Sequence, residues 1–517
     1  MRRGGNWLCG FTFVAMIFGL GAARNGRAQT ASPPPPASAQ QATPLWKPKS
    51  TVYLKAWNTH QYQEFGASIA ISGDGKTLAV GAPLDDSGAT GVNGDQSSHS
   101  ARDSGAVFVY SRKGNIWSQQ AYLKASNTDP GDQFGSVVAL SEDGNTLAVG
   151  AYLEDSAGTG VNGNQADNSM KNSGAVYVFT RNGGAWSQQA YVKASNTGEK
   201  DEGDQFGYVV ALSGDGNTLA VGAIGEDSAA KGINGDQSDN SADGSGAVCV
   251  FVRSGGAWSQ QAYVKSSDTA RGLLFGYSVG LSGNGNALAV GAYDEDGGRG
   301  AVYVFARSRD TWSQEAHLKA SNAERGDSLG CAIAISSDGN TVLAGAFDED
   351  ALLTGIQPPD AGASDQRTDT SAGAAYIFVR GGGQWTQQAY MKASNTRKDD
   401  QFGWALALSG DGNTAAVGSH LEDSGATGIN GNQADSSAED SGAVYVFTRK
   451  GSAWTQQAYV KASNARAYAE FGISLALSRD GKTLGVGAFK EDSSANGVNG
   501  NQMDHTASNA GSAYVYY

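Results

Sequence analysis

The sequence contains few cysteines and few histidines, three and five respectively in 517 residues. So few cysteines exclude a disulfide-stapled scaffold, and no Cys-x-x-Cys pair marks a zinc or redox site. After removal of a leader, only Cys249 and Cys331 remain, and we expect both to be buried as small hydrophobic residues. The five histidines, His60, His99, His317, His420 and His505, stand at unrelated positions. We therefore expect no enzymatic site.

An excess of positive charge is also missing, since the formal net charge is −14. Nucleic acids and anionic membrane surfaces attract basic patches, so neither is an expected partner. The sequence has one long apolar run, residues 7–23, which follows Arg2 and Arg3 and precedes Gly26-Arg27-Ala28. This order predicts a secretory signal over residues 1–28, with a retained membrane anchor as the alternative. We expect a secreted or surface-exposed protein whose mature chain does not insert into membranes.

Residues 29–45 contain four consecutive prolines and no core-forming pattern, which predicts a stiff spacer. The remaining chain, residues 46–517, is rich in glycine (73 in the whole sequence) and repeats one pattern seven times. Each repeat has a Phe-Gly pair, an alternating apolar segment, an Asp-Gly turn, "LAVGA", a long polar stretch, "GAVYVF" and "SQQAYVKASNT". The pairs begin at Phe65, Phe134, Phe206, Phe275, Phe402 and Phe471, with Leu329 in the remaining unit.

Four apolar segments of strand length in each of seven units predict an all-β, seven-bladed β-propeller with four-stranded antiparallel blades. A solenoid is the alternative, although solenoid repeats are usually shorter. The chain ends favour the ring. "YLKA" at Tyr53 is a spare fourth strand, and the last unit stops after its third strand, "SAYVYY". We expect the N-terminal strand to complete the last blade and close the circle.

The Phe-Gly openings and the Gly-Ala after "LAV" resemble the FG-GAP repeat, with the full form at Gly81-Ala82-Pro83. That repeat builds the β-propeller at the head of integrin alpha subunits and of many bacterial surface proteins. The resemblance covers residues 46–517 and implies adhesion or recognition. Family calcium sites lie between the first and second strands, but here that connection is only a tight turn. Asp74, Asp143 and Asp215 are therefore interpreted as turn residues.

The long polar stretch between the second and third strands is the remaining candidate for calcium, because it offers carboxylate and amide oxygens. The candidate ligands are Asp155, Asn162, Asn164 and Asp167, with Asp227, Asn234, Asp236 and Asp239 in the next unit. The alternative is structural, because Asn-Gly and Asp side chains satisfy turn backbone without a metal. Calcium is the only cofactor that the sequence suggests.

Unit four lacks this long stretch, and unit five carries an altered one, so we expect a notch on the loop face. The candidate ligand-binding residues are Asp294, Glu295, Asp296, Arg299, Asp360 and Asp365. We expect a monomer that binds a protein or a glycan there. An extracellular hydrolase or lyase acting at the notch, and a structural module of the cell envelope, are the alternatives.

Overall fold

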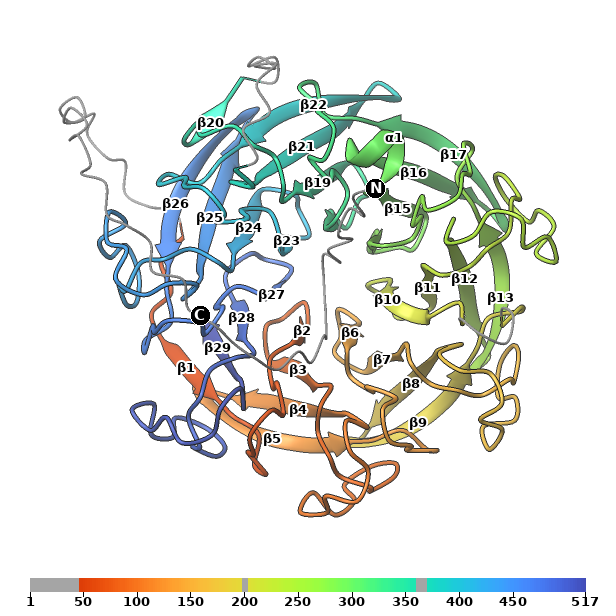
Figure 1. Ribbon diagram of the computed structural model, residues 1–517, viewed down its shortest axis with the longest axis horizontal. Helices are drawn as coiled ribbons and strands as arrows, with labels where there is room; N and C mark the ends of the chain where they lie inside the picture. Colours follow the sequence, from red (N-terminus) through yellow and green to blue (C-terminus); the bar gives the residue numbers. More distant parts are fainter. Residues whose placement is uncertain (1–45, 198–202, 359–369) are drawn as a thin grey trace, which may run out of the picture.

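Seven β-sheets surround one central axis in the computed structural model, which describes residues 46–197, 203–358 and 370–517 (Figure 1). The predicted seven-bladed propeller is confirmed. Blades one to three are β2 (Ser68–Ile71), β3 (Thr77–Ala82), β4 (Ala106–Lys113), β5 (Ile116–Leu123); β6 (Val137–Leu140), β7 (Thr146–Ala151), β8 (Ala175–Asn182), β9 (Ala185–Val192); and β10 (Phe206–Leu212), β11 (Thr218–Ala223), β12 (Ala247–Ser254), β13 (Ala257–Val264).

Blades four to seven follow the same antiparallel order. They are β14 (Val279–Leu281), β15 (Ala287–Ala292), β16 (Ala301–Ser308), β17 (Thr311–Leu318); β18 (Ile333–Ile335), β19 (Thr341–Ala346), β21 (Ala374–Gly381), β22 (Gln384–Met391); β23 (Leu406–Leu408), β24 (Thr414–Ser419), β25 (Ala443–Lys450), β26 (Ala453–Val460); and β27 (Ser474–Leu477), β28 (Leu484–Ala488), β29 (Ser512–Tyr516), β1 (Thr51–Leu54). Blade five carries an extra outer strand, β20 (Ile356–Gln357), and blade four a short helical turn, α1 (Glu295–Gly298).

The N-terminal strand closes the ring, as its sequence predicts. β1 pairs with β29 in a register that places Tyr53 opposite Tyr514. Trp46 is buried, and its indole Nε1 donates to the carbonyl of Gly481 at 3.1 Å. The last residue, Tyr517, packs beneath the Arg112 guanidinium of blade one, 4.3 Å from the ring centroid. Tyr517 therefore bridges blades seven and one, whereas Trp46 packs in the cluster between blades six and seven.

The tight turns between first and second strands have the expected chemistry. In blade two, the Oδ1 of Asp143 accepts the Asn145 N–H at 2.9 Å, and Gly144 adopts a φ of 69°. Burial alone would raise the pKa of Asp143, but hydrogen bonds from Ser141 and Asn145 lower it. Asp74 and Asp215 make the same backbone contact, so all three act as turn residues.

The two glycines of the repeat motif let neighbouring blades touch. A Cβ on Gly135, in the Phe-Gly pair of blade two, would lie 2.5 Å from the Ala106 carbonyl oxygen of blade one. A Cβ on Gly150, in the Gly-Ala pair, would lie 2.2 Å from the Gly207 oxygen of blade three. Any side chain at these positions would push the blades apart, which explains why both glycines recur.

The hydrophobic core lies between adjacent blades. Val107 of blade one packs in one cluster with Phe134, Tyr177 and Tyr191 of blade two. The fourth-strand tyrosines Tyr122, Tyr191, Tyr263, Tyr390 and Tyr459 are all buried and so belong to the packing between strands and blades. The two described cysteines, Cys249 and Cys331, are free and buried, also as predicted.

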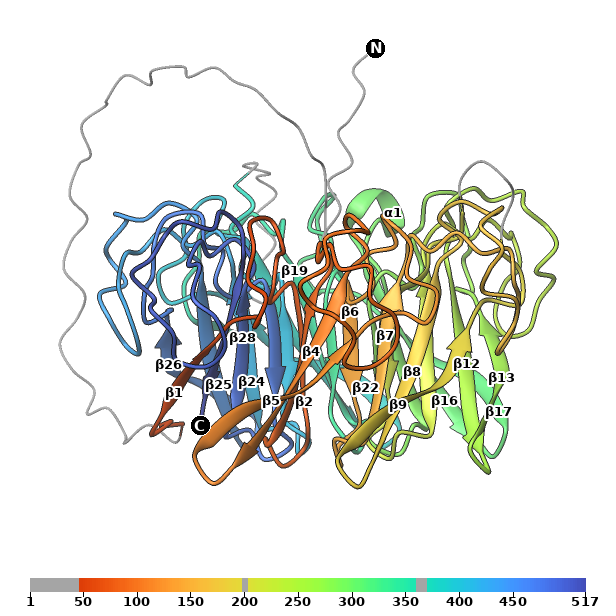
Figure 2. The same ribbon diagram turned by 90° about the horizontal axis from the view of Figure 1, so that it is seen from below.

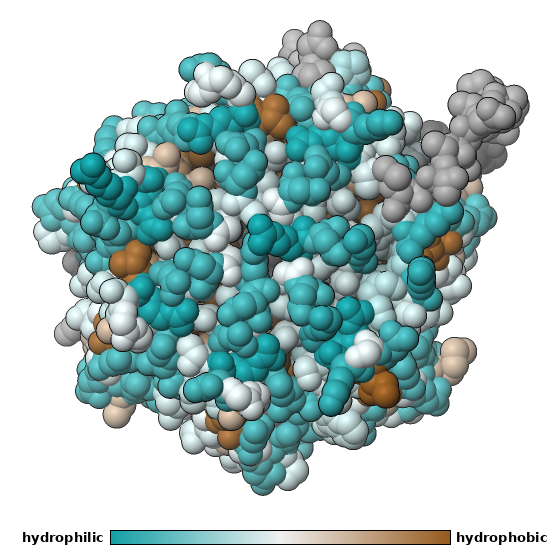
Figure 3. Space-filling model, turned by 180° about the vertical axis from the view of Figure 1, so that it is seen from behind, coloured by the Kyte–Doolittle hydropathy of each residue, from teal (hydrophilic) through white to brown (hydrophobic). Residues whose placement is uncertain are grey.

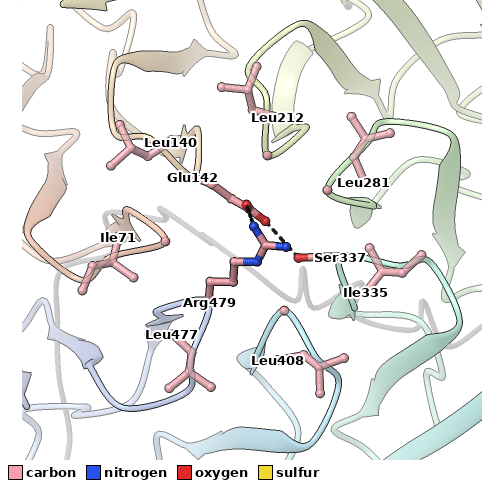
Figure 4. A pocket seen from close by; sticks show the side chains of 14 residues that line it. Ile71, Leu140, Glu142, Leu212, Leu281, Ile335, Ser337, Leu408, Leu477 and Arg479 are labelled. Atoms are coloured by element: carbon pink, nitrogen blue, oxygen red, sulfur yellow. Dashed lines mark hydrogen bonds and ion pairs between the residues drawn. The ribbon is translucent and has the colours of Figure 1, made fainter.

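Long loops gather on one face of the ring and short hairpin turns on the other (Figure 2). The turn face is largely hydrophilic (Figure 3). At its centre, seven apolar side chains, one from each blade, line the channel: Ile71, Leu140, Leu212, Leu281, Ile335, Leu408 and Leu477 (Figure 4). Beside them, Arg479 and Ser337 meet Glu142 across the axis, at 2.6 and 2.9 Å. These polar contacts narrow the channel at the turn face.

Several sequence predictions concern residues outside the described ranges. The signal sequence (1–28) and the spacer (29–45) lie there, and so do the candidate residues Asp360 and Asp365. Within residues 46–197, 203–358 and 370–517, no helix has the length and apolar character needed to span a bilayer.

Candidate binding site at blade four

Each long loop between second and third strands folds back along the outer edge of its own blade. In blade two, Val161 forms a β-bridge with Val192 of the fourth strand. Asn162 adopts a φ of 56°, its N–H donates to the Tyr191 carbonyl at 2.7 Å, and its Oδ1 accepts the Tyr191 N–H at 3.0 Å. The same side-chain contact is made in their own blades by Asn93, Asn234 and Asn430. The same backbone contact is made in blade seven by Asn499. The recurring Asn-Gly step therefore attaches each long loop to the fourth strand, at the outer edge of its blade.

The eight candidate calcium ligands all have an oxygen engaged by a backbone N–H. In blade two, Asp155, Asn162, Asn164 and Asp167 accept from Asn172, Tyr191, Ala166 and Ser169, at 2.8 to 3.1 Å. In blade three, Asp227, Asn234, Asp236 and Asp239 accept from Gly244, Tyr263, Ser238 and Ser241, at 2.7 to 3.0 Å. These contacts give every one of the eight a part in shaping its loop, and calcium binding by them stays a prediction.

In the acidic pair that opens each long loop, the first residue is buried and the second is half-buried. Glu154 is 1% exposed, and its Oε2 lies 2.8 Å from Nζ of Lys193, itself fully buried. The Tyr191 hydroxyl and the Asn127 amide donate to Glu154 Oε1 at 2.8 and 3.0 Å. Three partners, Lys193, Tyr191 and Asn127, thus surround the buried glutamate, which makes the burial of its charge tolerable.

The same lysine–acid pair recurs around the ring. Nζ–oxygen distances in the other long-loop blades are 3.1 Å (Lys55–Glu491), 3.7 Å (Lys124–Asp85), 2.6 Å (Lys265–Glu226), 2.5 Å (Lys392–Glu349) and 2.7 Å (Lys461–Glu422). Burial lowers the pKa of each of these lysines, against the pull of its carboxylate partner. The sequence carries a signal for these pairs, because a lysine just after the fourth strand and an acid a few residues after the second strand recur in every unit.

Blade four exposes this pair. Its loop is replaced by α1, and Nζ of Lys319 lies 2.9 Å from Oε1 of Glu295. The Lys319 side chain is 34% exposed, whereas the lysines of the other six blades are 0% exposed. The loss of fifteen loop residues therefore uncovers a charge pair that the rest of the ring conceals.

A histidine replaces the usual fourth-strand tyrosine in this opening. Nε2 of His317 lies 2.9 Å from Glu295 Oε1, and the His317 ring stacks on Tyr303 at 4.4 Å. The Tyr303 hydroxyl donates to Glu295 Oε2 at 2.6 Å. Burial would raise the pKa of Glu295, but hydrogen bonds from His317, Lys319 and Tyr303 lower it to about 2. Glu295 is therefore an anion surrounded by donors.

The structure brings together four of the six ligand-binding residues predicted from sequence. Arg299 lies 3.2 Å from Asp296, and Lys319 lies 3.9 Å from the same carboxylate. Asp294 and Asp296 are exposed, while Glu295 beneath them is buried. Partial burial raises the pKa of Asp294. Sequence reasoning missed His317 and Lys319, which complete the opening.

A further cation from the next connection borders the opening. Arg325, which leads into blade five, is exposed. Its guanidinium lies against Gly297, where a Cβ would come within 2.8 Å of Nε. The surface thus carries four basic or ionisable side chains, Arg299, His317, Lys319 and Arg325, beside three carboxylates. Such mixed charge suits charge-assisted hydrogen bonds with a polar ligand.

Six segments of the chain match the FG-GAP repeat, at residues 117–179, 186–251, 258–305, 312–378, 385–447 and 454–516. The chain belongs to the FG-GAP repeat family. Each matched segment of this FG-GAP propeller begins at a hairpin tryptophan and runs into the next blade, so the repeats overlap the blades. The segment 258–305 enters blade four and is the shortest, because the long loop is missing there.

No curated protein matches the chain. Among solved structures, the crystal structure of the β-propeller domain of Cps50 (Swd1) from Myceliophteria thermophila aligns with this FG-GAP propeller at a TM-score of 0.47 and 9% identity. The alignment covers 90% of this chain and 99% of that chain.

The FG-GAP propeller also holds one deeply buried acid in several blades. Asp132, Asp204 and Asp400 precede their Phe-Gly pairs, and burial together with the nearby loop glutamate raises the pKa of each to about 8. Asp327 has a pKa of about 7 for the same reasons, with a backbone hydrogen bond opposing them. Blade four has Leu273 at this position, so its opening lacks the second buried acid.

Two Gly-x-Ser-x-Gly segments invite comparison with a hydrolase nucleophile, but neither serine is placed for that role. Ser278 is buried and donates to the Gly330 carbonyl at 2.6 Å. Ser328 is also buried and lies 3.3 Å from the Gly326 carbonyl. FG-GAP propellers are typically non-enzymatic domains.

Proposed function

We propose that this FG-GAP propeller is an extracellular recognition domain that binds a macromolecular ligand at the blade-four opening. The observation that carries the proposal is the exposed Lys319–Glu295 pair, because the same pair is sealed in the other six blades. An opening in one blade of a repeating ring provides one distinct site on an otherwise similar surface. Concave sites with a few convergent polar groups are preferred by ligands.

A protein segment is the ligand that the chemistry favours over a glycan. The opening offers charged partners of both signs, including Arg299, Lys319 and Asp296. Glycan sites commonly use exposed aromatic rings as stacking surfaces, whereas the nearby Tyr277 and Tyr293 are buried. A polar protein segment with carboxylate or amide groups would pair with Lys319 and Arg325 in place of water.

The experiment is a binding array of matrix proteins and glycans, probed with the wild-type protein and with Lys319→Ala plus Arg325→Ala. We expect capture by the wild type and at least tenfold weaker capture by the variant. His505→Ala, an exposed loop-face substitution in blade seven, is the matched control and should bind normally. Equal capture by all three proteins would contradict the location of the site.

Secretion is part of the same proposal and rests on the apolar run at residues 7–23. We expect the exported protein to begin after residue 28 and to behave as a monomer. Intact mass spectrometry and light scattering measure both. A full-length mass in the membrane fraction would favour a retained anchor instead.

Calcium binding by the loops of blades two and three is a separate proposal. Its support is the carboxylates of Asp167, Asp236 and Asp239, of which Asp236 is exposed and the other two are half-buried, oxygen ligands of the kind that calcium prefers. Running the array and a thermal melt with and without a calcium chelator tests it. An unchanged melt and unchanged capture would contradict it.

One observation favours a hydrolase or lyase as the second candidate. His317 is hydrogen-bonded to Glu295 in an open site, an arrangement that suits a general base. Turnover of an ester or polysaccharide panel that disappears in His317→Ala, with no capture on the array, would support the enzyme.

A further inference from the structure

Two histidines and an aspartate meet where the chain enters blade one. His60 lies in the connection from β1 to β2, and Asp86 and His99 lie in the loop from β3 to β4. One ligand atom from each side chain lies within 4.8 Å of the other two. Among all described residues, this is the one such group of three His, Cys, Asp or Glu side chains. Its members come from segments 26 or more residues apart, so sequence spacing gives no hint of it.

The His60 ring is oriented like that of a metal ligand. Its Nδ1 lies 3.0 Å from the Gln61 carbonyl, which can only accept, so Nδ1 carries the proton. In the neutral ring, Nε2 then carries the lone pair, and it is buried without a hydrogen-bond partner. Asp85 Oδ2, at 3.9 Å, is beyond hydrogen-bonding distance. Metal-binding histidines usually donate their other N–H to a carbonyl or carboxylate in this way.

The other two members face His60. The His99 ring lies 5.2 Å from the His60 ring, nearly perpendicular at 88°. Asp86 is held by one oxygen, since its Oδ1 accepts the Asp103 N–H at 2.9 Å. The second oxygen of a carboxylate fixed in this way can coordinate a cation without disturbing the loop.

The other blades show what this position normally does. In blade two, Asp129 and Asn168 stand where blade one has His60 and His99, and they are hydrogen-bonded directly at 3.0 Å. In blade seven, Arg466 takes the place of His60 and lies 3.2 Å from Asp492, the counterpart of Asp86. A side-chain cation thus already occupies this position in blade seven. Blade one has two imidazoles and no fixed cation.

We propose that His60, Asp86 and His99 bind a divalent transition metal ion of the zinc type. Two imidazole nitrogens and one carboxylate oxygen form a ligand set that favours zinc, because calcium and magnesium are bound by oxygen ligands. Bonds of about 2.0–2.1 Å place tetrahedral ligand atoms roughly 3.3 Å apart, so the group must contract slightly. His99 is exposed and can rotate to do so. The ion links the connection from β1 to β2, which holds His60, to the β3–β4 loop of blade one. The three side chains leave the fourth coordination position of the ion open.

The test is a titration of the metal-stripped full chain with Zn²⁺ by calorimetry, with Co²⁺ absorption as a spectroscopic readout of coordination. We expect one equivalent of Zn²⁺ to bind and to raise the melting temperature, and Ca²⁺ at the same concentration to do neither at this site. The double variant His60→Asp plus His99→Asn recreates the hydrogen-bonded pair of blade two, so it should fold. We expect it to lose the equivalent and the Co²⁺ signal.

His505→Asn is the matched control. His505 occupies the same loop position in blade seven as His99 in blade one, so these two histidines are not at unrelated positions, but Arg466 stands in blade seven where blade one has His60. We expect this variant to bind Zn²⁺ like the wild type. Absence of binding by the wild type, or equal binding by a folded double variant, would overturn the proposal.

Discussion

Nζ of Lys319 lies 2.9 Å from Glu295 with a third of its side chain in solvent, whereas Nζ of Lys193 lies 2.8 Å from Glu154 and is fully buried. The two pairs have the same positions in their repeats and nearly the same length. They differ because blade two keeps its long loop and blade four has lost it. Because of this difference, the lysine–glutamate pair is buried in blade two and accessible to solvent in blade four.

The two lysines should therefore respond differently to the same substitution. Lys193→Met leaves Glu154 buried without its cation, and we expect a loss of about 3–5 kcal/mol in the free energy of unfolding. Lys319→Met leaves Glu295 with solvent, His317 and Tyr303, and we expect a loss below about 1 kcal/mol. Urea unfolding of both variants measures the contrast. Equal losses would show that the blade-four pair is as structural as the others.

The buried aspartates predict a pH dependence of stability. The pKa of Asp132 and of Asp400 is about 8 in the folded protein, far above the unfolded value of about 3.9. Between these values the folded state binds more protons than the unfolded state, so their contribution to stability falls as the pH rises from about 4 to about 8. We expect Asp132→Asn plus Asp400→Asn to raise the melting temperature at pH 8 and to have little effect near pH 4.

Asp143→Asn is the control of opposite sign. Hydrogen bonds in the turn lower the pKa of Asp143 despite its partial burial, so its contribution is present at neutral pH and is lost in acid. We expect this variant to melt slightly lower at pH 8. If the double variant also melted lower at pH 8, the buried aspartates would have to be ionised and paired.

Ring closure makes the N-terminal strand essential for stability. A chain that starts at residue 59 lacks Trp46, Tyr53 and Leu54, all buried, and each large side chain contributes roughly 1.5–3 kcal/mol. We expect its melting temperature to fall sharply relative to a chain that starts at Trp46. Differential scanning calorimetry compares the two, and identical melts would contradict a closed ring.

Most of the fold could be predicted because seven repeats report the same pattern seven times. Phe-Gly and Gly-Ala marked the close approaches between blades, and the spare strand at Tyr53 fixed the closure. The blade-four notch was also visible, as fifteen missing residues.

The buried charges could not be read from single segments. Glu154 and Lys193 are 39 residues apart and both look like solvated residues, because only the folded loop turns the glutamate inward. His60 and His99 come together for the same kind of reason: each connection between blades packs against the loop of the blade it enters. Such contacts follow from the ring geometry, which local pattern does not contain.

The most direct test of recognition at blade four is to close the opening. Replacing residues 297–299 with residues 156–173 of blade two, together with His317→Tyr, restores the missing loop and its tyrosine. The control makes the reverse exchange in blade two and leaves blade four unchanged. With the ligand captured on the array, surface plasmon resonance should show binding lost in the closed variant and kept in the control, with both proteins folded. Full-strength binding by a folded, closed variant would contradict a ligand site at the blade-four opening.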